Sequence, residues 1–133
     1  MIKLPKKPFE NITTVQMWSD PYISLSMLKY HLNLTNDIAS RNGDTIEKTV
    51  NFISKWLKKG DSICDFGCGP GLYTDLFQKK EFNVIGVDVS INALDYAKSK
   101  NKNVRYIQQN YIDSIIDESI NVAIMIYCDF GAM

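Results

Sequence analysis

The sequence reads ICDFGCGPGLYT from Ile63 to Thr74. An apolar run ends there in three closely spaced glycines, Gly67, Gly69 and Gly71, and an amphipathic segment follows. Glycine has no Cβ atom, so the backbone at such positions can turn sharply and can touch a ligand directly. Free N–H groups at the start of a following helix favour a polar or negatively charged ligand group. The pattern predicts a strand, a ligand-binding turn and a helix.

An acidic residue marks the end of the next apolar run. Asp88 follows Asp65 by twenty-three residues and closes a predicted strand over 82–89. A carboxylate at this position can accept hydrogen bonds from both hydroxyls of a ribose. The whole arrangement predicts the nucleoside-binding layout of a doubly wound sheet. Two plainer interpretations stay open: the glycines form only a tight turn, and Asp88 only caps a helix near Ser90.

From Asp61 onward, predicted strands and helices alternate along the chain. Continuously apolar strands are typical of a parallel sheet that is covered by helices on both faces. We therefore predict an α/β fold with a doubly wound parallel sheet. Its predicted elements are strands over 62–66, 82–89, 104–108 and 120–127, and helices over 72–80 and 90–99.

The N-terminal part predicts an arm and two helices. Residues 1–17 contain two prolines, which favour an irregular arm. Asp20 is the expected N-cap of a helix over 20–32, and Asp44 with Glu47 forms a capping-box pattern before a helix over 45–58. We predict an arm and cap helix over 1–44 and a ligand-binding unit over 45–133.

The spacing of the glycines narrows the class of ligand. A dinucleotide fingerprint reads G-x-G-x-x-G, whereas this chain has G-x-G-x-G with an acidic residue two positions before the first glycine. The combination Asp65-x-Gly67-x-Gly69-x-Gly71, with Asp88 downstream, resembles motif I and the acidic end of strand 2 in class I S-adenosylmethionine-dependent methyltransferases. The resemblance covers about residues 45–133. It implies a Rossmann-like fold, S-adenosylmethionine as cofactor and methyl transfer as the activity.

The resemblance also implies a set of cofactor-binding residues. The glycine loop would contact the methionine part of the cofactor, Asp88 the ribose, and Val89 the adenine. Asn110 stands where the family often has an aspartate that accepts from the adenine amino group, and its amide oxygen can accept in the same way. The residues expected to bind the cofactor are Asp65, Gly67, Cys68, Gly69, Gly71, Asp88, Val89, Asn110, Tyr111 and Tyr127.

The side of the methyl acceptor is less defined by the sequence. The segment 127–130 follows the fourth strand and does not spell the Asn/Asp-Pro-Pro-Tyr motif of amino-group nucleic-acid methyltransferases. The candidates for catalysis are Tyr127, Asp129 and His31, although His31 on an apolar helix face also fits a structural role. Arg41 and Tyr22 are candidates for the carboxylate of the cofactor. The helices over 20–58 would form a cap over the cofactor and the acceptor.

Composition limits the partners. Lysine plus arginine and aspartate plus glutamate both number 15, so the formal net charge is zero, which disfavours nucleic acid and favours a small-molecule or protein acceptor. No apolar run is long enough to span a membrane. Three cysteines and one histidine do not supply a four-ligand zinc pattern, so no metal is expected. An odd number of cysteines without a secretory signal predicts reduced thiols and a cytoplasmic location.

The family sheet has seven strands in the order 3-2-1-4-5-7-6, and this chain supplies four of them. The outer edge of the strand over 120–127 would then be bare, and a bare edge invites pairing with another chain. We expect either that the remaining strands belong to a longer protein or that this strand pairs with its own copy in a homodimer. Two other functions stay open: an NAD(P)-dependent oxidoreductase domain, and a non-catalytic methyltransferase fragment that binds the cofactor or dimerises.

Overall fold

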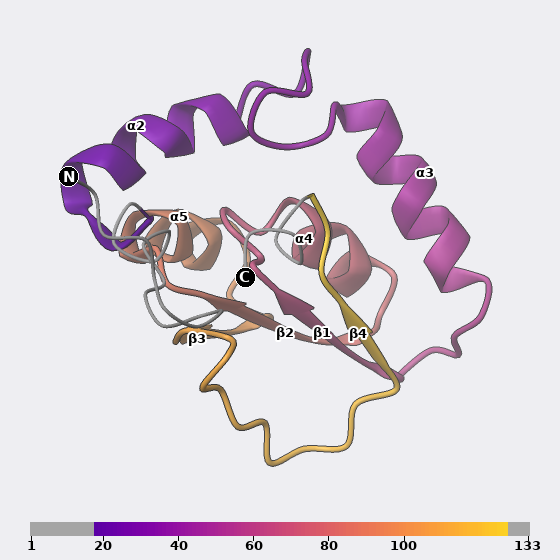
Figure 1. The fold of residues 1–133 in the computed structure, drawn as a ribbon. Coiled ribbons are helices and arrows are strands. Elements are labelled where there is room, and N and C mark those ends of the chain that lie inside the picture. The colour runs from indigo at the N-terminus through magenta and orange to yellow at the C-terminus, as the bar shows by residue number, and fades with distance from the viewer. Residues whose placement is uncertain (1–17, 128–133) are drawn as a thin grey trace, which may run out of the picture.

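The computed structural model describes residues 18–127. Its four strands form one parallel sheet in the order β3-β2-β1-β4 (Figure 1). The central position of β1 places Asp65 between Gly86 of β2 and Ile124 of β4. This confirms the α/β class and the predicted strand order. The strands are β1 (Ser62–Phe66), β2 (Asn83–Asp88), β3 (Arg105–Gln108) and β4 (Val122–Ile124).

Four helices of the described chain accompany the sheet, and their starts follow from local capping. The Asp20 carboxylate accepts from the backbone N–H groups of Tyr22 and Ile23, both at 2.9 Å, and so opens the first helix as predicted. No membrane-spanning candidate occurs among these helices, because none combines the necessary length with an apolar composition. The helices are α2 (Pro21–His31), α3 (Gly43–Ser54), α4 (Leu72–Lys79) and α5 (Ile91–Lys100).

Three element boundaries differ from the sequence prediction. Asn42, not Asp44, caps α3, because its side-chain oxygen accepts from the N–H of Thr45 at 3.0 Å. Asp44 lies in the first turn, where its charge favours the positive end of the helix dipole. The helix ends at Ser54 rather than 58, and β4 is shorter than predicted because only three of its residues pair with β1.

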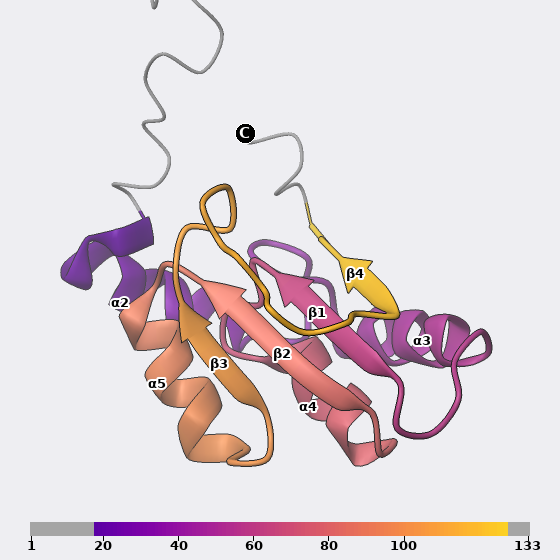
Figure 2. The same cartoon turned by 90° about the horizontal axis from the view of Figure 1, so that it is seen from below.

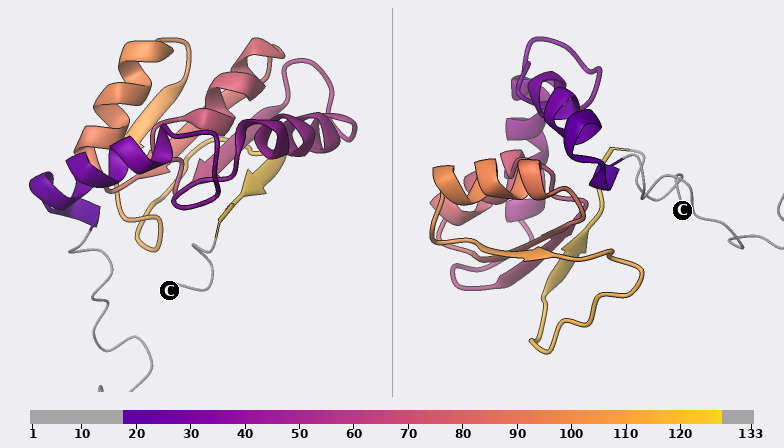
Figure 3. Two further views of the ribbon diagram at one scale, coloured as in Figure 1. Left: turned by 90° about the horizontal axis from the view of Figure 1, so that it is seen from above. Right: turned by 90° about the vertical axis from the view of Figure 1, so that its left-hand side faces the viewer.

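The two faces of the sheet are covered differently. Figures 2 and 3 show the described helices on one face and the β3–β4 connection, residues 109–121, on the other. On that second face Tyr111, Ile116 and Ile120 pack against a cluster that includes Cys64 and Val87. The prediction of helices on both faces is therefore wrong for residues 18–127. The connection stays irregular because side chains such as Asn110, which accepts from Ile112 N–H at 3.1 Å, bind nearby backbone instead.

The helical face holds the larger core. Phe77 of α4, Ile63 of β1 and Val50 of α3 are buried there. The first helix lies over α5, and Asn92 at the start of α5 donates to the carbonyl of Pro21 at 2.9 Å and to Ser24 Oγ at 2.7 Å. These bonds place α2 above the carboxyl ends of the strands. In a parallel sheet of this kind, ligands bind at that end.

Candidate functional site

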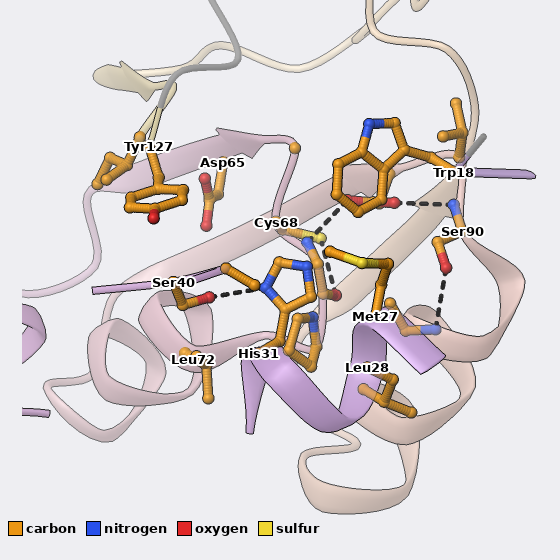
Figure 4. A pocket seen from close by; sticks show the side chains of 18 of the residues that line it. Trp18, Met27, Leu28, His31, Ser40, Asp65, Cys68, Leu72, Ser90 and Tyr127 are labelled. Atoms are coloured by element: carbon orange, nitrogen blue, oxygen red, sulfur yellow. Dashed lines mark hydrogen bonds between the residues drawn. The ribbon is translucent and has the colours of Figure 1, made fainter. Parts of the chain in front are cut away.

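A cavity of about 290 Å³ opens at the carboxyl ends of β1 and β2 beneath α2 (Figure 4). Its size is at the lower end of small-molecule sites in proteins. The loops that follow all four strands contribute to its wall, together with α2 and the segment 38–41. Of the residues predicted to bind a cofactor, it brings together Asp65, Gly67, Cys68, Gly69, Asp88, Val89, Asn110, Tyr111 and Tyr127.

The glycine-rich turn is built by backbone that only glycine adopts easily. Gly67, Gly69 and Gly71 have φ angles of 78°, 52° and 80°, in the left-handed region that costs other residues about 1–2 kcal/mol. The N–H groups of Gly67 and Cys68 both donate to the carbonyl of Val87, at 2.8 and 3.1 Å. The turn is therefore fixed against the end of β2. A Cβ atom at Gly69 would meet no atom within 4 Å, so a ligand has room to approach this backbone.

The third glycine, Gly71, stands where the protein leaves no space for a side chain. Gly71 is not among the residues that line the cavity. A Cβ atom there would lie 2.6 Å from the Tyr106 hydroxyl and 3.0 Å from Thr74 Oγ1, and these two oxygens are themselves 2.8 Å apart. The space on the Cβ side of Gly71 is therefore filled by the protein itself, and the contact of Gly71 with a cofactor stays a prediction.

Asp88 joins the two loops that frame the cavity. One carboxylate oxygen accepts from Gly69 N–H and the other from Ser90 N–H, both at 2.8 Å. Burial raises the pKa of Asp88, and the backbone N–H donors of Ser90, Gly69 and Val89 oppose that shift. Ser90 rather than Asp88 caps α5, since the Ser90 hydroxyl oxygen accepts from Ala93 N–H at 3.3 Å. Each carboxylate oxygen of Asp88 keeps a second lone pair, which a ligand hydroxyl can use.

The other acidic residue of the motif lies deeper. Asp65 is 2% exposed and lines the cavity from the end of β1. Its charge is the second cause, after burial, of the raised pKa of Cys68. A buried thiol whose pKa is well above its usual value is no nucleophile at neutral pH. Cys64 is fully buried in the sheet, and Cys128 lies outside the described residues.

The turn after β3 closes the far side of the cavity. Gln109 N–H donates to the carbonyl of Asp88 at 3.0 Å, which holds the turn beside β2. Asn110 and Tyr111 both line the cavity. The amide oxygen of Asn110 already accepts from Ile112 N–H, so its second lone pair and its amide N–H groups remain for a ligand.

The end of α2 carries a histidine that points to the cavity (Figure 4). His31 Nδ1 and Ser40 Oγ are 2.7 Å apart, and the ring centroids of Trp18 and His31 are 6.0 Å apart. Burial lowers the pKa of His31. The bond to Ser40 fixes the ring, so that Nε2 is the nitrogen left for another partner.

A second contact fastens the segment 37–41 to the end of β4. Tyr127 has a φ of 72° and its hydroxyl donates to the carbonyls of Asp37 and Ile38, the latter at 3.0 Å. The guanidinium carbon of Arg41 lies 4.9 Å from the centroid of the Tyr127 ring. Arg41 therefore lines the cavity as expected, whereas Tyr22 is 83% exposed and does not. The remaining catalytic candidate, Asp129, lies outside the described residues.

The sequence did not reveal several residues of the wall. Met27 and Leu28 of α2 carried a signal in their helical spacing with His31, and Tyr73 lies within the motif itself. Ser40 and Ile38 carried none, because they stand in an irregular segment whose position depends on tertiary contacts. The lining residues absent from the predicted set are Trp18, Ser24, Met27, Leu28, Ile38, Ala39, Ser40, Pro70, Leu72, Tyr73, Ser90, Ala93, Ile112 and Ile126.

Comparison with known proteins points to one family. A ribosomal protein L11 methyltransferase from Thermotoga neapolitana is 32% identical over 117 residues, which cover 85% of this chain and 41% of that protein. A carboxy-S-adenosyl-L-methionine synthase from Campylobacter jejuni is 33% identical over 100 residues, which cover 74% of this chain and 37% of that protein. The chain thus spans about two fifths of the length of these curated relatives.

The fold is shared with solved structures. A TehB-like SAM-dependent methyltransferase from Corynebacterium glutamicum superposes with a TM-score of 0.68 at 22% identity, covering 83% of this chain and 59% of that one. The family model described as a methyltransferase domain matches residues 38–128, more than half of the chain and the whole of the glycine-rich turn and sheet. The chain belongs to this family of methyltransferase domains.

Proposed function

We propose that this chain provides the cofactor pocket of an S-adenosylmethionine-dependent methyltransferase. The observation that carries the proposal is the meeting of Asp65, the Gly67–Gly69 turn and Asp88 around one cavity at the carboxyl end of a parallel sheet. Membership of the methyltransferase domain family supports it. The comparisons give no support to the alternative of an NAD(P)-dependent oxidoreductase.

The residues present fit this cofactor. Asp88 has free lone pairs for the ribose hydroxyls, and the open space beside Gly69 lets a ligand reach the turn. Val89, Asn110 and Tyr111 line the part of the wall proposed to hold the adenine. The deep carboxylate of Asp65 suits the positive charges of the methionine part, because charges interact more strongly away from water.

When bound, the cofactor supplies an electrophilic methyl group on a sulfonium. The contribution of the chain is to position this group and to exclude water, and positioning is where proximity effects are large. Trp18, Met27 and Leu28 give the cavity an apolar wall beneath α2. Within that wall the neutral His31 is proposed as the group that accepts a proton from the acceptor, with Ser40 holding its ring. Tyr127 lines the cavity, and its roles in cofactor binding and catalysis stay proposals.

The acceptor is proposed to be a small molecule or a protein. Zero formal charge disfavours a nucleic-acid acceptor. The name of one relative, a ribosomal protein L11 methyltransferase, gives a protein as the methyl acceptor. This name supports a protein acceptor and leaves a small-molecule acceptor open. A homodimer through the outer edge of β4 and a cytoplasmic location also stay proposals, as does the alternative of a non-catalytic cofactor-binding module.

The direct test is a calorimetric titration of the chain with S-adenosylhomocysteine, with NAD as the matched control ligand. We expect saturable binding of S-adenosylhomocysteine and none of NAD, because the turn has G-x-G-x-G spacing and an acidic residue beside it. Binding of NAD alone would overturn the proposal. A folded chain that binds neither ligand, as judged by circular dichroism, would contradict it as well.

A further inference from the structure

The wall of the cavity includes one buried tyrosine hydroxyl, that of Tyr73. Tyr73 is the second residue of α4, is 8% exposed and lines the cavity. Its hydroxyl oxygen is fully buried and has no hydrogen-bond partner among residues 18–127. A buried hydroxyl without a partner costs free energy, so such a group calls for an explanation. A ligand that completes its hydrogen bonding would supply one.

The charges around this hydroxyl limit the kind of ligand. Burial is the first cause of the raised pKa of Tyr73, and the charge of Asp65 is the second, while Arg41 acts in the opposite direction. A raised pKa keeps the hydroxyl protonated at neutral pH, so that it can donate. Asp65 and Arg41 both line the same cavity. Asp37 raises the pKa of Tyr73 as well, so the hydroxyl lies within the field of two negative side chains, Asp65 and Asp37, and one positive side chain, Arg41.

The two charged side chains Asp65 and Arg41 lie toward one end of the cavity. Figure 4 shows Asp65 and Tyr127 at one end and Ser90 and Trp18 at the other, and Arg41 stacks on the Tyr127 ring. An anion, a cation and a hydroxyl donor together complement a zwitterion. An α-amino-acid head group has this chemistry, since its ammonium pairs with a carboxylate and its carboxylate with a guanidinium and a hydroxyl.

We propose that Tyr73 is a specificity-determining residue whose hydroxyl donates a hydrogen bond to the carboxylate at the amino-acid end of the cofactor. The proposal rests on the proposed function, because it assumes that the cofactor carries this end into the cavity. It adds a residue that distinguishes the intact cofactor from a nucleoside that lacks the amino-acid tail.

The neighbouring Tyr106 provides a matched contrast. Its hydroxyl also lies near the start of α4, but it is paired with Thr74 Oγ1 at 2.8 Å and is not among the lining residues. Removing the Tyr106 hydroxyl deletes a hydrogen bond within the protein, whereas removing the Tyr73 hydroxyl deletes none that the structure describes. The two Tyr→Phe changes therefore separate a ligand-binding hydroxyl from a structural one.

The experiment measures the affinity of wild type, Tyr73→Phe and Tyr106→Phe for two ligands by calorimetry. One ligand is S-adenosylhomocysteine and the other is 5′-deoxy-5′-methylthioadenosine, which keeps the nucleoside and the sulfur but lacks the amino-acid end. We expect Tyr73→Phe to raise the Kd of S-adenosylhomocysteine by about 10- to 150-fold, the effect of one lost hydrogen bond to a charged group. The Kd of the shorter ligand should not change, and the thermal midpoint of the ligand-free variant should not fall.

Four results would overturn the inference. Unchanged binding of S-adenosylhomocysteine by Tyr73→Phe would do so, and so would equal weakening of both ligands. Binding of free methionine that depends on Tyr73, with S-adenosylhomocysteine unaffected, would assign the subsite to an amino-acid acceptor instead. A wild type that binds neither nucleoside removes the proposed function and this inference together, whereas the other three results leave the proposed function standing.

Discussion

Asp88 is the residue in which the fold and the proposed binding site depend on the same atoms. Its two oxygens hold Gly69 and Ser90 in place and are also the proposed acceptors for the ribose. A substitution there has two effects, on the loops and on the ligand. Asparagine keeps one oxygen and the size of the side chain, so Asp88→Asn separates these effects better than Asp88→Ala.

We expect Asp88→Asn to weaken binding of S-adenosylhomocysteine by about 1–3 kcal/mol, because a ribose hydroxyl loses its charged acceptor. Asp88→Ala should weaken binding at least as much and also lower the free energy of unfolding. Calorimetry measures the first quantity and urea denaturation the second. Unchanged affinity in both variants would contradict the assignment of Asp88 to the ribose.

His31 makes the stability of the chain depend on pH. Burial places its pKa below 6.5 in the folded state, so the unfolded chain binds the proton more readily. This residue therefore contributes stability above about pH 6.5, and the contribution is lost as the pH falls through the lower folded pKa. Wild type should lose more of its free energy of unfolding between pH 7 and pH 5 than His31→Gln. Urea denaturation at each pH measures these free energies of unfolding. Equal losses in the two proteins would show that His31 does not cause the pH dependence of stability.

At the scale of elements, Gly71 of the glycine-rich turn can be compared with Gly60, which precedes β1. Gly71 has both a left-handed φ and a filled space beside it. Gly60 has a φ of 88° but no atom within 4 Å of a built Cβ. The pair therefore separates the cost of backbone strain from the cost of crowding.

We expect Gly60→Ala to cost about 1–2 kcal/mol of unfolding free energy, the strain of a left-handed alanine. Gly71→Ala should cost about 1–3 kcal/mol more, because the Tyr106 hydroxyl must move. Denaturant titration of the two variants measures both quantities. If Gly71→Ala were no less stable than Gly60→Ala, then the space beside Gly71 would not be filled as the structure shows.

The segment 37–41 is an element without regular structure that the end of β4 holds in place. A hydrogen bond from the Tyr127 hydroxyl, shared between the carbonyls of Asp37 and Ile38, fastens it. We expect Tyr127→Phe to loosen this segment with little effect on the sheet, since one lost hydrogen bond is worth about 0.5–1.5 kcal/mol. Hydrogen exchange should accelerate at 37–41 and stay unchanged in β1 and β2. Tyr22→Phe, a change at an exposed residue, serves as the control, and equal exchange in both variants would argue against the fastening.

At the scale of the whole molecule, the sheet ends in a strand with only one partner. Within residues 18–127, β4 pairs with β1 alone. If this edge pairs with its own copy, sedimentation should show a dimer whose population rises with concentration. A lysine on an edge strand opposes such pairing, so Ala123→Lys at this exposed residue should shift the chain toward monomer. A wild-type chain that stays monomeric at every concentration would contradict the proposal of a homodimer.

The sequence alone determined the positions of the strands along the chain, the glycine-rich turn and the two acidic residues, because these depend on local periodicity and short-range spacing. The order of the strands in the sheet followed from the resemblance to the methyltransferase family. Tertiary structure alone decided the rest. The space beside Gly71 is filled by Tyr106 of β3, which lies thirty-five residues away along the chain. Ser40, Arg41 and Tyr127 meet at one end of the cavity because β4 returns beside β1. Contacts between segments so far apart leave no periodic signal in the sequence, since each is fixed by packing rather than by neighbours along the chain.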